Sequence, residues 1–216
     1  MAIALETQTL SRYYGKFCAL APTSFSISDR EIIVVSGQNG AGKSTLLLCL
    51  MGILRPTSGS VQVNGYDLYK NEVEAKKRLA FVPDVPRFYT ELTAWEHLKF
   101  IALAHNADED FEDRAAAILT ELDLWEVRDL FPHNYSRGMR LKLGLALAII
   151  RPFQVLIMDE PASAFDPQSV DYLKKKLLQL REQGSTVLFT SHNLSLISDL
   201  NARHWVMEKG ILELDT

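Results

Sequence analysis

Apolar runs bounded by glycine alternate with segments of helical periodicity along most of the chain. The run REIIVVSG (30–37) is rich in β-branched residues and ends in glycine, so it predicts a buried strand, and a helix is expected over about 43–51. The segment GSVQVNG (59–65) alternates between apolar and polar positions, which predicts a strand with a turn after it. A further short strand is expected at LAFVPD (79–84).

The middle of the chain has the periodicity of helices, from Thr93 to about Leu124. Its first part opens with a threonine and carries Glu96 at the third helical position, which is the pattern of a capping box. Its second part, ADEDFEDRAAAILTELDL (107–124), begins with acidic residues, which stabilise the start of a helix. A third helix, with basic residues near its start, is expected from about Ser136 to Ile150.

The second half of the chain alternates strands and helices. Strands are predicted at FQVLIMDE (153–160), STVLFTSH (185–192) and ARHWVMEKG (202–210). The segments between them predict a long helix that ends at Gly184 and a short helix over 193–200. Alternation on this scale is typical of a mostly parallel sheet with helices on its faces.

The whole pattern predicts an α/β fold. We expect a mostly parallel core sheet, an antiparallel β subdomain formed by the earlier strands, and a helical insertion at about 85–135. No linker separates these parts, so residues 1–216 are interpreted as a single domain with lobes.

Composition narrows the class of protein. Hydrophobic residues make up 47% and charged residues 23% of the chain, and the formal net charge of -4 gives no electrostatic basis for binding nucleic acid. The longest apolar runs, at 46–54 and 143–150, are far shorter than the roughly 20 residues that span a bilayer. The two cysteines, Cys18 and Cys49, lack a metal-binding spacing and are interpreted as reduced thiols.

A glycine-rich segment between the first predicted strand and helix matches the pattern G-x-x-x-x-G-K-[ST]. In such a loop, glycines let successive backbone N–H groups point at phosphate oxygens, and the start of the helix attracts the same anion. Lys43 is expected to reach the β and γ phosphates, and Ser44 to hold Mg²⁺. The predicted phosphate-binding residues are Gly37, Gln38, Asn39, Gly40, Ala41, Gly42, Lys43, Ser44 and Thr45.

Two carboxylates follow the apolar strand VLIM (155–158). Ligands of parallel sheets bind at the carboxyl ends of the strands, where Asp159 and Glu160 are expected to lie. Asp159 is the candidate Mg²⁺ carboxylate, and Glu160 is the candidate base that activates a water molecule. An isolated Asp-Glu pair would more often be a solvated turn, but the glycine-rich loop favours the site.

The segment NYSRGMRLKL (134–143) allows two interpretations. It is either the capped start of a surface helix or an altered phosphate-binding signature that acts on a nucleotide held by another copy of the chain. The segment alone does not decide between them.

The order of these motifs resembles the nucleotide-binding subunit of ABC transporters across essentially the whole chain. Tyr14 falls where that family has an aromatic residue that stacks on adenine, with its neighbour Tyr13 as the rival. VPDVP (82–86) falls at the Q-loop, and YSRGM (135–139) falls at the LSGGQ signature. Ala164-Phe165-Asp166 and TSH (190–192) fall at the D-loop and at the switch histidine.

The resemblance implies a head-to-tail dimer that binds ATP between the P-loop of one chain and the signature of the other. The dimer would consist of two copies of this chain or of this chain and a related subunit. Glu160 and His192 would be catalytic, and Asp84 would join Ser44 and Asp159 as a metal ligand. The signature residues acting on the partner's ATP would be Ser136, Arg137, Gly138 and Met139, with Asp166 in the D-loop.

The resemblance also implies a separate integral membrane permease, against which the helical lobe would dock. The chain would then lie on the cytoplasmic face of the cell membrane. Aspartate at position 84 replaces the family's glutamine, and Arg137 and Met139 replace glycine and glutamine, which is most similar to the ABC-2 and drug-resistance exporter branch. The alternative is a soluble ABC ATPase of the assembly or repair type, which would transport nothing.

Overall fold

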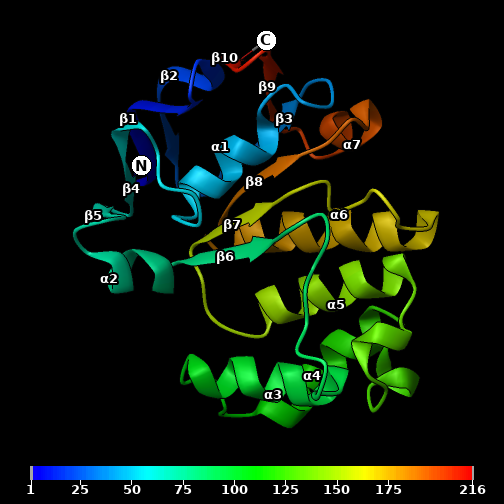
Figure 1. The fold of residues 1–216 in the computed structure, drawn as a ribbon. Coiled ribbons are helices and arrows are strands. Elements are labelled where there is room, and N and C mark those ends of the chain that lie inside the picture. The colour runs from blue at the N-terminus through cyan, green and yellow to red at the C-terminus, as the bar shows by residue number, and fades with distance from the viewer. Residues whose placement is uncertain (1, 216) are drawn as a thin grey trace.

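The computed structural model describes residues 2–215, apart from the side chain of Leu194. Two sheets and the helices around them form the molecule (Figure 1). The strands are β1 (Ile3–Tyr14), β2 (Phe17–Ser28), β3 (Ile32–Ser36), β4 (Ser58–Val63), β5 (Tyr66–Asp67), β6 (Leu79–Val82), β7 (Val155–Met158), β8 (Thr186–Thr190), β9 (Arg203–Glu208) and β10 (Ile211–Glu213). The α-helices are α1 (Lys43–Leu50), α2 (Glu72–Lys77), α3 (Ala94–Ala104), α4 (Phe111–Glu121), α5 (Arg137–Ile149), α6 (Pro167–Glu182) and α7 (Leu194–Asp199).

The larger sheet has the strand order β10-β9-β3-β8-β7-β6. Its strands pair in parallel from β9 to β6, and the edge strand β10 pairs antiparallel with β9. The three central strands are short apolar runs because helices or sheet cover both of their faces. The predicted α/β fold with a mostly parallel core sheet is confirmed.

The smaller sheet has the order β2-β1-β4-β5, and all of its pairs are antiparallel. The expectation that the earlier strands are antiparallel is correct for the strand predicted at 59–65. It is wrong for the strands predicted at 30–37 and 79–84, because β3 and β6 belong to the parallel sheet. The long β1–β2 hairpin and helix α2 were not predicted. The burial pattern of the two strands is irregular because they pack against α1, and β1 also pairs with β4. Helix α2 buries only Ala75, so it has no apolar stripe.

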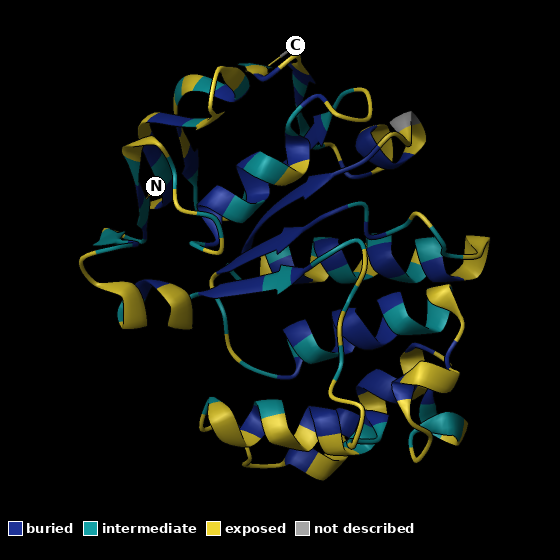
Figure 2. Cartoon of the chain, in the orientation of Figure 1, coloured by how far each residue is buried: buried dark blue, intermediate teal, exposed yellow. Residues whose placement is uncertain are grey.

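Successive residues of β3 face different cores, as the pleat of a strand requires. Ile33 and Val35 pack with α1 and the antiparallel sheet, whereas Ile32 and Val34 pack with the helices on the opposite face. Strand β3 and its neighbours β7 and β8 therefore lie between two apolar layers, and Figure 2 shows the central strands in dark blue through the middle of the molecule.

The helices expected at 93–124 are α3 and α4, which lie with α5 on the side of the sheet opposite α1 (Figure 1). The capping box is confirmed: the Thr93 side chain accepts from Glu96 N, and the Glu96 carboxylate accepts from Thr93 N. Two 3-10 turns, Trp125–Val127 and Pro132–Asn134, then connect α4 to α5. Within residues 2–215, no helix is long and apolar enough to cross a lipid bilayer.

Candidate functional site

The glycine-rich loop between β3 and α1 is closely surrounded by backbone. A Cβ atom at Gly37 would lie 2.1 Å from the Met207 carbonyl oxygen, and one at Gly42 would lie 2.3 Å from the Ala19 carbonyl oxygen. Gly42 also has a φ of 111°, which side chains rarely tolerate, and it precedes α1 without a side-chain cap. The loop therefore needs glycine at these positions, and it presents the uncapped start of a helix, which favours anions.

Lys43 places its ammonium group inside this loop. The Nζ atom donates to the carbonyl oxygens of Gly37 (2.6 Å) and Gln38 (3.3 Å), and the side chain is 7% exposed. It also lies 3.2 Å from His192 Nε2 and 3.9 Å from the Glu160 carboxylate. A buried cation that contacts both the loop and the opposite strand ends is suited to bind a phosphate anion.

The carboxylates at the end of β7 are held by the neighbouring strand β8. The Thr190 hydroxyl donates to Asp159 Oδ1 at 2.7 Å and accepts from the Glu160 backbone N–H at 2.8 Å. Glu160 has a φ of 48°, an uncommon conformation for a residue with a side chain. The pairing of β7 with β8 thus fixes both residues at the end of β7, and it places the Glu160 carboxylate beside Lys43.

The Glu160 side chain is mostly buried beside two basic groups. Its Oε1 atom lies 3.1 Å from His192 Nε2, but within the described residues it has no hydrogen-bond partner. Burial raises the pKa of the Glu160 carboxyl, and the charges of His192 and Lys43 oppose that rise. A carboxylate with an unsatisfied oxygen and a raised pKa can accept a proton from a water molecule.

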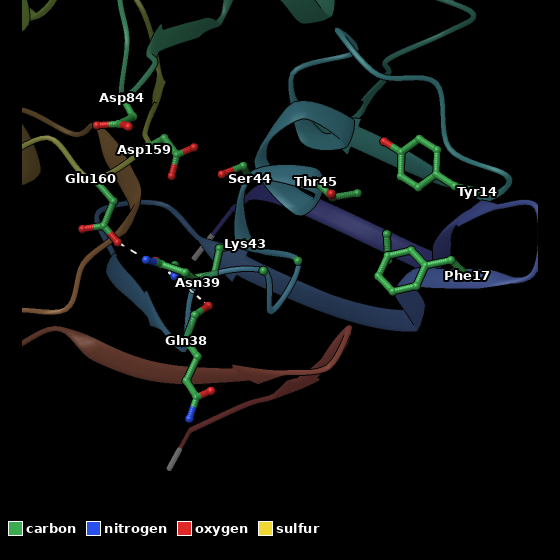
Figure 3. Close-up of a pocket in the computed structure, with 13 residues that line it drawn as sticks. Tyr14, Phe17, Gln38, Asn39, Lys43, Ser44, Thr45, Asp84, Asp159 and Glu160 are labelled. Atoms are coloured by element: carbon green, nitrogen blue, oxygen red, sulfur yellow. Dashed lines mark hydrogen bonds and ion pairs between the residues drawn. The ribbon is translucent and has the colours of Figure 1, made fainter.

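One cavity of about 290 Å³ joins the loop to these carboxylates (Figure 3). Asp84, Asp159 and Glu160 lie at one end, and the aromatic side chains of Tyr14 and Phe17 lie at the other. Of the predicted phosphate-binding residues, Gln38, Asn39, Gly40, Gly42, Lys43, Ser44 and Thr45 line it. Gly37 and Ala41 do not line it: Gly37 supplies a carbonyl to Lys43, and the carbonyl of Ala41 accepts from Gly210 N.

The aromatic end of the cavity comes from the β1–β2 hairpin. Tyr14 lies in the lining, whereas its rival Tyr13 does not and pairs across the hairpin with Cys18. Phe17 was not predicted from the sequence; it is paired with Tyr14 and is 64% exposed. Phe17 could have been identified from the sequence because it follows Tyr14 directly across the short turn at Gly15.

The predicted signature residues lie outside this cavity. Ser136 is the N-cap of α5, and its hydroxyl accepts from Met139 N at 3.2 Å. Arg137 donates to Asp84 Oδ1 at 2.8 Å, and a Cβ atom at Gly138 would lie 2.7 Å from the Ala164 carbonyl oxygen. Within the described residues, Ser136, Arg137, Gly138 and Met139 do not line the chain's own phosphate cavity.

The D-loop candidate Asp166 caps the next helix. Its carboxylate accepts from both the backbone and the hydroxyl of Ser169, and these bonds lower the pKa of Asp166. His97 lies outside the phosphate cavity: it is buried, and its ring nitrogens bond to Tyr89 N and the Thr93 carbonyl.

The family model described as ABC transporter matches residues 20–163. The linearmycin resistance ATP-binding protein LnrL of Bacillus subtilis is 32% identical, over 95% of this chain and 67% of that protein. The methionine import ATP-binding protein MetN of Chlamydia caviae is also 32% identical, over 97% of this chain but 64% of its own length. The SkfA peptide export ATP-binding protein SkfE of Bacillus subtilis is 31% identical, over 98% and 88% of the two chains.

Solved structures agree with these relatives. One described as the ATP-binding subunit of an ABC transporter superposes with a TM-score of 0.91 and 27% identity, over 98% of this chain and 90% of that chain. The cavity bounded by the glycine-rich loop and Glu160 is thus found in a chain with the fold of such subunits. The chain belongs to the ABC transporter family and is an ATP-binding subunit that hydrolyses ATP.

Proposed function

We propose that this chain drives a separate integral membrane permease by hydrolysing ATP, and that the transporter is an exporter. The observation that carries the proposal is the grouping of Lys43, Glu160 and His192: the first two line the phosphate cavity, and His192 contacts both. The direction of transport rests on the likeness to exporter subunits such as SkfE, and on the exporter-type residues at Asp84 and in YSRGM.

The cavity is assigned to ATP. The triphosphate lies on the glycine-rich loop and the start of α1, and Lys43 neutralises its β and γ phosphates. The adenine ring lies toward Tyr14 and Phe17, whose exposed faces offer it a stacking surface. Residues 1–216 form a single ATPase domain, and the helices within about 85–135 form its helical lobe.

The residues around the loop are suited to Mg²⁺. Ser44, Asp84 and Asp159 line the same cavity and offer the hard oxygen ligands that this ion prefers. Within residues 2–215, no cluster of three or more His, Cys, Asp or Glu could hold a metal by itself, so the ion needs phosphate oxygens as well. When bound, Mg²⁺ would supply positive charge that offsets the charge of the phosphates, and Ser44, Asp84 and Asp159 would hold it.

Glu160 acts as the base in hydrolysis. Its carboxylate accepts a proton from the water molecule that attacks the γ-phosphate. His192 contacts both Glu160 and Lys43, so it orients the carboxylate and detects the γ-phosphate beside Lys43.

A head-to-tail dimer completes the site. Within the described residues, the start of α5, capped by Ser136, does not line the chain's own cavity, and in the dimer it meets the γ-phosphate held by a partner chain. The partner is a second copy of this chain or a related subunit. ATP then closes the dimer because it contacts both chains, and hydrolysis opens it.

An apolar groove beside the helical lobe supports docking to a permease. It has a volume of about 410 Å³ and lies among the segment after α1, strand β6, α3 and α5. Its lining includes Ile53, Phe81 and Phe88. Ile53 is 60% exposed, and nearby Val85 is 68% exposed. Exposed apolar surface of this kind favours a protein partner, and the chain would then lie on the cytoplasmic face of the cell membrane.

The test is a pull-down of the Glu160→Gln variant from detergent-solubilised native membranes with ATP present. We expect an equal amount of a polytopic membrane protein, identified by mass spectrometry. Adding Ile53→Asp should abolish its recovery, whereas Ile211→Asp, which charges an equally exposed isoleucine on β10, should not. Recovery of soluble partners alone would contradict the transporter and favour an assembly ATPase.

A further inference from the structure

Three polar side chains meet between the phosphate cavity and the start of α5. The Arg137 guanidinium donates to Asp84 Oδ1 at 2.8 Å and to the Ser163 hydroxyl at 3.2 Å. The Ser163 hydroxyl also donates to Asp84 Oδ1 at 3.3 Å. The group joins three segments that are distant in sequence: the loop after β6, the start of α5 and the loop after β7. Two of its members, Asp84 and Arg137, stand where the motifs that the chain resembles have glutamine and glycine.

Asp84 brings a negative charge to a cavity that must receive a polyphosphate. It lines the cavity with two further carboxylates, Asp159 and Glu160, against the single ammonium group of Lys43 in that lining. Negative side chains close to the phosphates repel them and therefore weaken binding of the anion. The guanidinium of Arg137 compensates the Asp84 charge directly, since the two side chains form a salt bridge.

The other end of the salt bridge anchors the signature segment. Arg137 is the first residue of α5, and its contacts with Asp84 and Ser163 hold that helix start against two loops of its own chain. The neighbouring Gly138 lies so close to the Ala164 carbonyl that a Cβ atom there would be 2.7 Å from the oxygen. A change at Asp84 therefore reaches the start of α5 through a direct contact.

We propose that Arg137 is a positioning residue that acts within its own chain, neutralising Asp84 at the phosphate cavity and linking the signature segment to the occupancy of that cavity. The proposal rests on the proposed function, because in a head-to-tail dimer the cavity and the signature of one chain serve different ATP molecules. The salt bridge then transmits the state of one ATP site to the other.

The test measures ATP binding to the dilute monomer by calorimetry, in the Glu160→Gln background and with the metal chelated. Arg137→Ala should weaken binding by about two- to fivefold, the range expected for a partly exposed ion pair. In a chain that also carries Asp84→Asn, Arg137→Ala should have no effect, because the charge that it compensates is gone. Arg137→Lys keeps a cation and should lose less than Arg137→Ala.

Arg140→Ala is the matched control. It removes a positive charge from the same turn of α5, but Arg140 bonds to the Tyr135 carbonyl and not to Asp84. The proposal would be overturned if Arg140→Ala weakened ATP binding as much as Arg137→Ala does. It would also be overturned if Arg137→Ala weakened ATP binding equally in chains with Asp84 and with Asp84→Asn. Unchanged monomer affinity with weaker dimerisation would overturn it too, and is the result expected if Arg137 acts on the partner's nucleotide.

Hydrogen exchange distinguishes coupling of the signature segment to ATP binding from charge compensation of Asp84 alone. ATP binding to the monomer should change the protection of the amides at residues 136–140, and Arg137→Ala should abolish that change. An unchanged response in the variant would overturn the link. If ATP binds but never produces a dimer of the Glu160→Gln chain, the proposed dimer fails instead, and the monomer measurements still decide the role of Arg137.

Discussion

At the residue scale, the environment of Glu160 is unfavourable for stability and favourable for chemistry. Its backbone has a positive φ, which costs about 1–2 kcal/mol for a residue with a side chain. Its Oε1 atom is buried without a hydrogen bond within the described residues, although Lys43 and His192 lie near it. Strain and unsatisfied polar atoms persist at functional sites because the surrounding structure enforces them, and here Thr190 and β8 do so.

We expect Glu160→Gln to bind ATP with nearly normal affinity and to hydrolyse it about 10²–10⁴-fold more slowly, because the amide cannot accept the proton of water. Calorimetry and steady-state phosphate release measure the two effects. Glu182→Gln, at the exposed end of α6, is the control and should behave as the unaltered chain. Normal turnover of Glu160→Gln would remove Glu160 from the mechanism.

Lys43→Ala should weaken ATP binding at least about tenfold, since hydrogen bonds to charged groups contribute about 1.5–3 kcal/mol each. The ammonium already donates to the loop carbonyls, so it is held in place before the nucleotide arrives. Lys175→Ala removes an exposed lysine on α6 and serves as the control. An unchanged dissociation constant for Lys43→Ala, measured by calorimetry, would contradict the assignment of the glycine-rich loop.

At the element scale, helix starts were the most predictable features. Thr93 caps α3 and Ser136 caps α5 through bonds to residues three positions ahead, so the sequence contains the whole interaction. The β1–β2 hairpin was not predictable in this way, because its two strands are stabilised by α1 and β4, far along the chain. For the same reason the sequence did not indicate the bond between Arg137 and Asp84, which lie 53 positions apart along the chain.

The two roles of Ser136 can be separated by substitution. Ser136→Ala removes the cap and should lower the free energy of unfolding by about 1 kcal/mol. Ser136→Asp keeps a good capping side chain, but it places a negative charge where the partner's γ-phosphate is expected, so stability should hold while ATP-driven dimerisation is lost. Chemical denaturation and light scattering measure these effects. If the Ser136→Asp variant dimerises normally, Ser136 caps α5 and has no role at the partner's γ-phosphate.

At the scale of the whole molecule, the parallel sheet connects the site to both apolar cores. The site lies at the carboxyl ends of β3 and β7, and α1, which starts in the phosphate loop, packs its leucines into the core shared with the antiparallel sheet. Ligand binding at the loop should therefore stabilise the core around α1. Cys49, near the end of α1, is fully buried there and can report on that core.

Burial raises the pKa of the Cys49 thiol to about 11, so at pH 8 the folded chain holds it as an unreactive thiol. Because the folded state keeps a proton that the unfolded state releases near pH 8.5, this group lowers stability as pH rises toward 11. In a Cys18→Ser variant, a thiol reagent at pH 8 should therefore modify Cys49 through unfolded molecules.

ATP at about 100 times its dissociation constant stabilises the chain by about 2.7 kcal/mol, so it should slow modification of Cys49 about 100-fold. Adding Lys43→Ala to the same variant should remove most of that protection, because the loop then binds ATP weakly. Mass spectrometry of the labelled chain gives the rate. If Cys49 reacts at the same rate with and without ATP, the α1 core opens without unfolding of the phosphate loop, and the two do not form one cooperative unit.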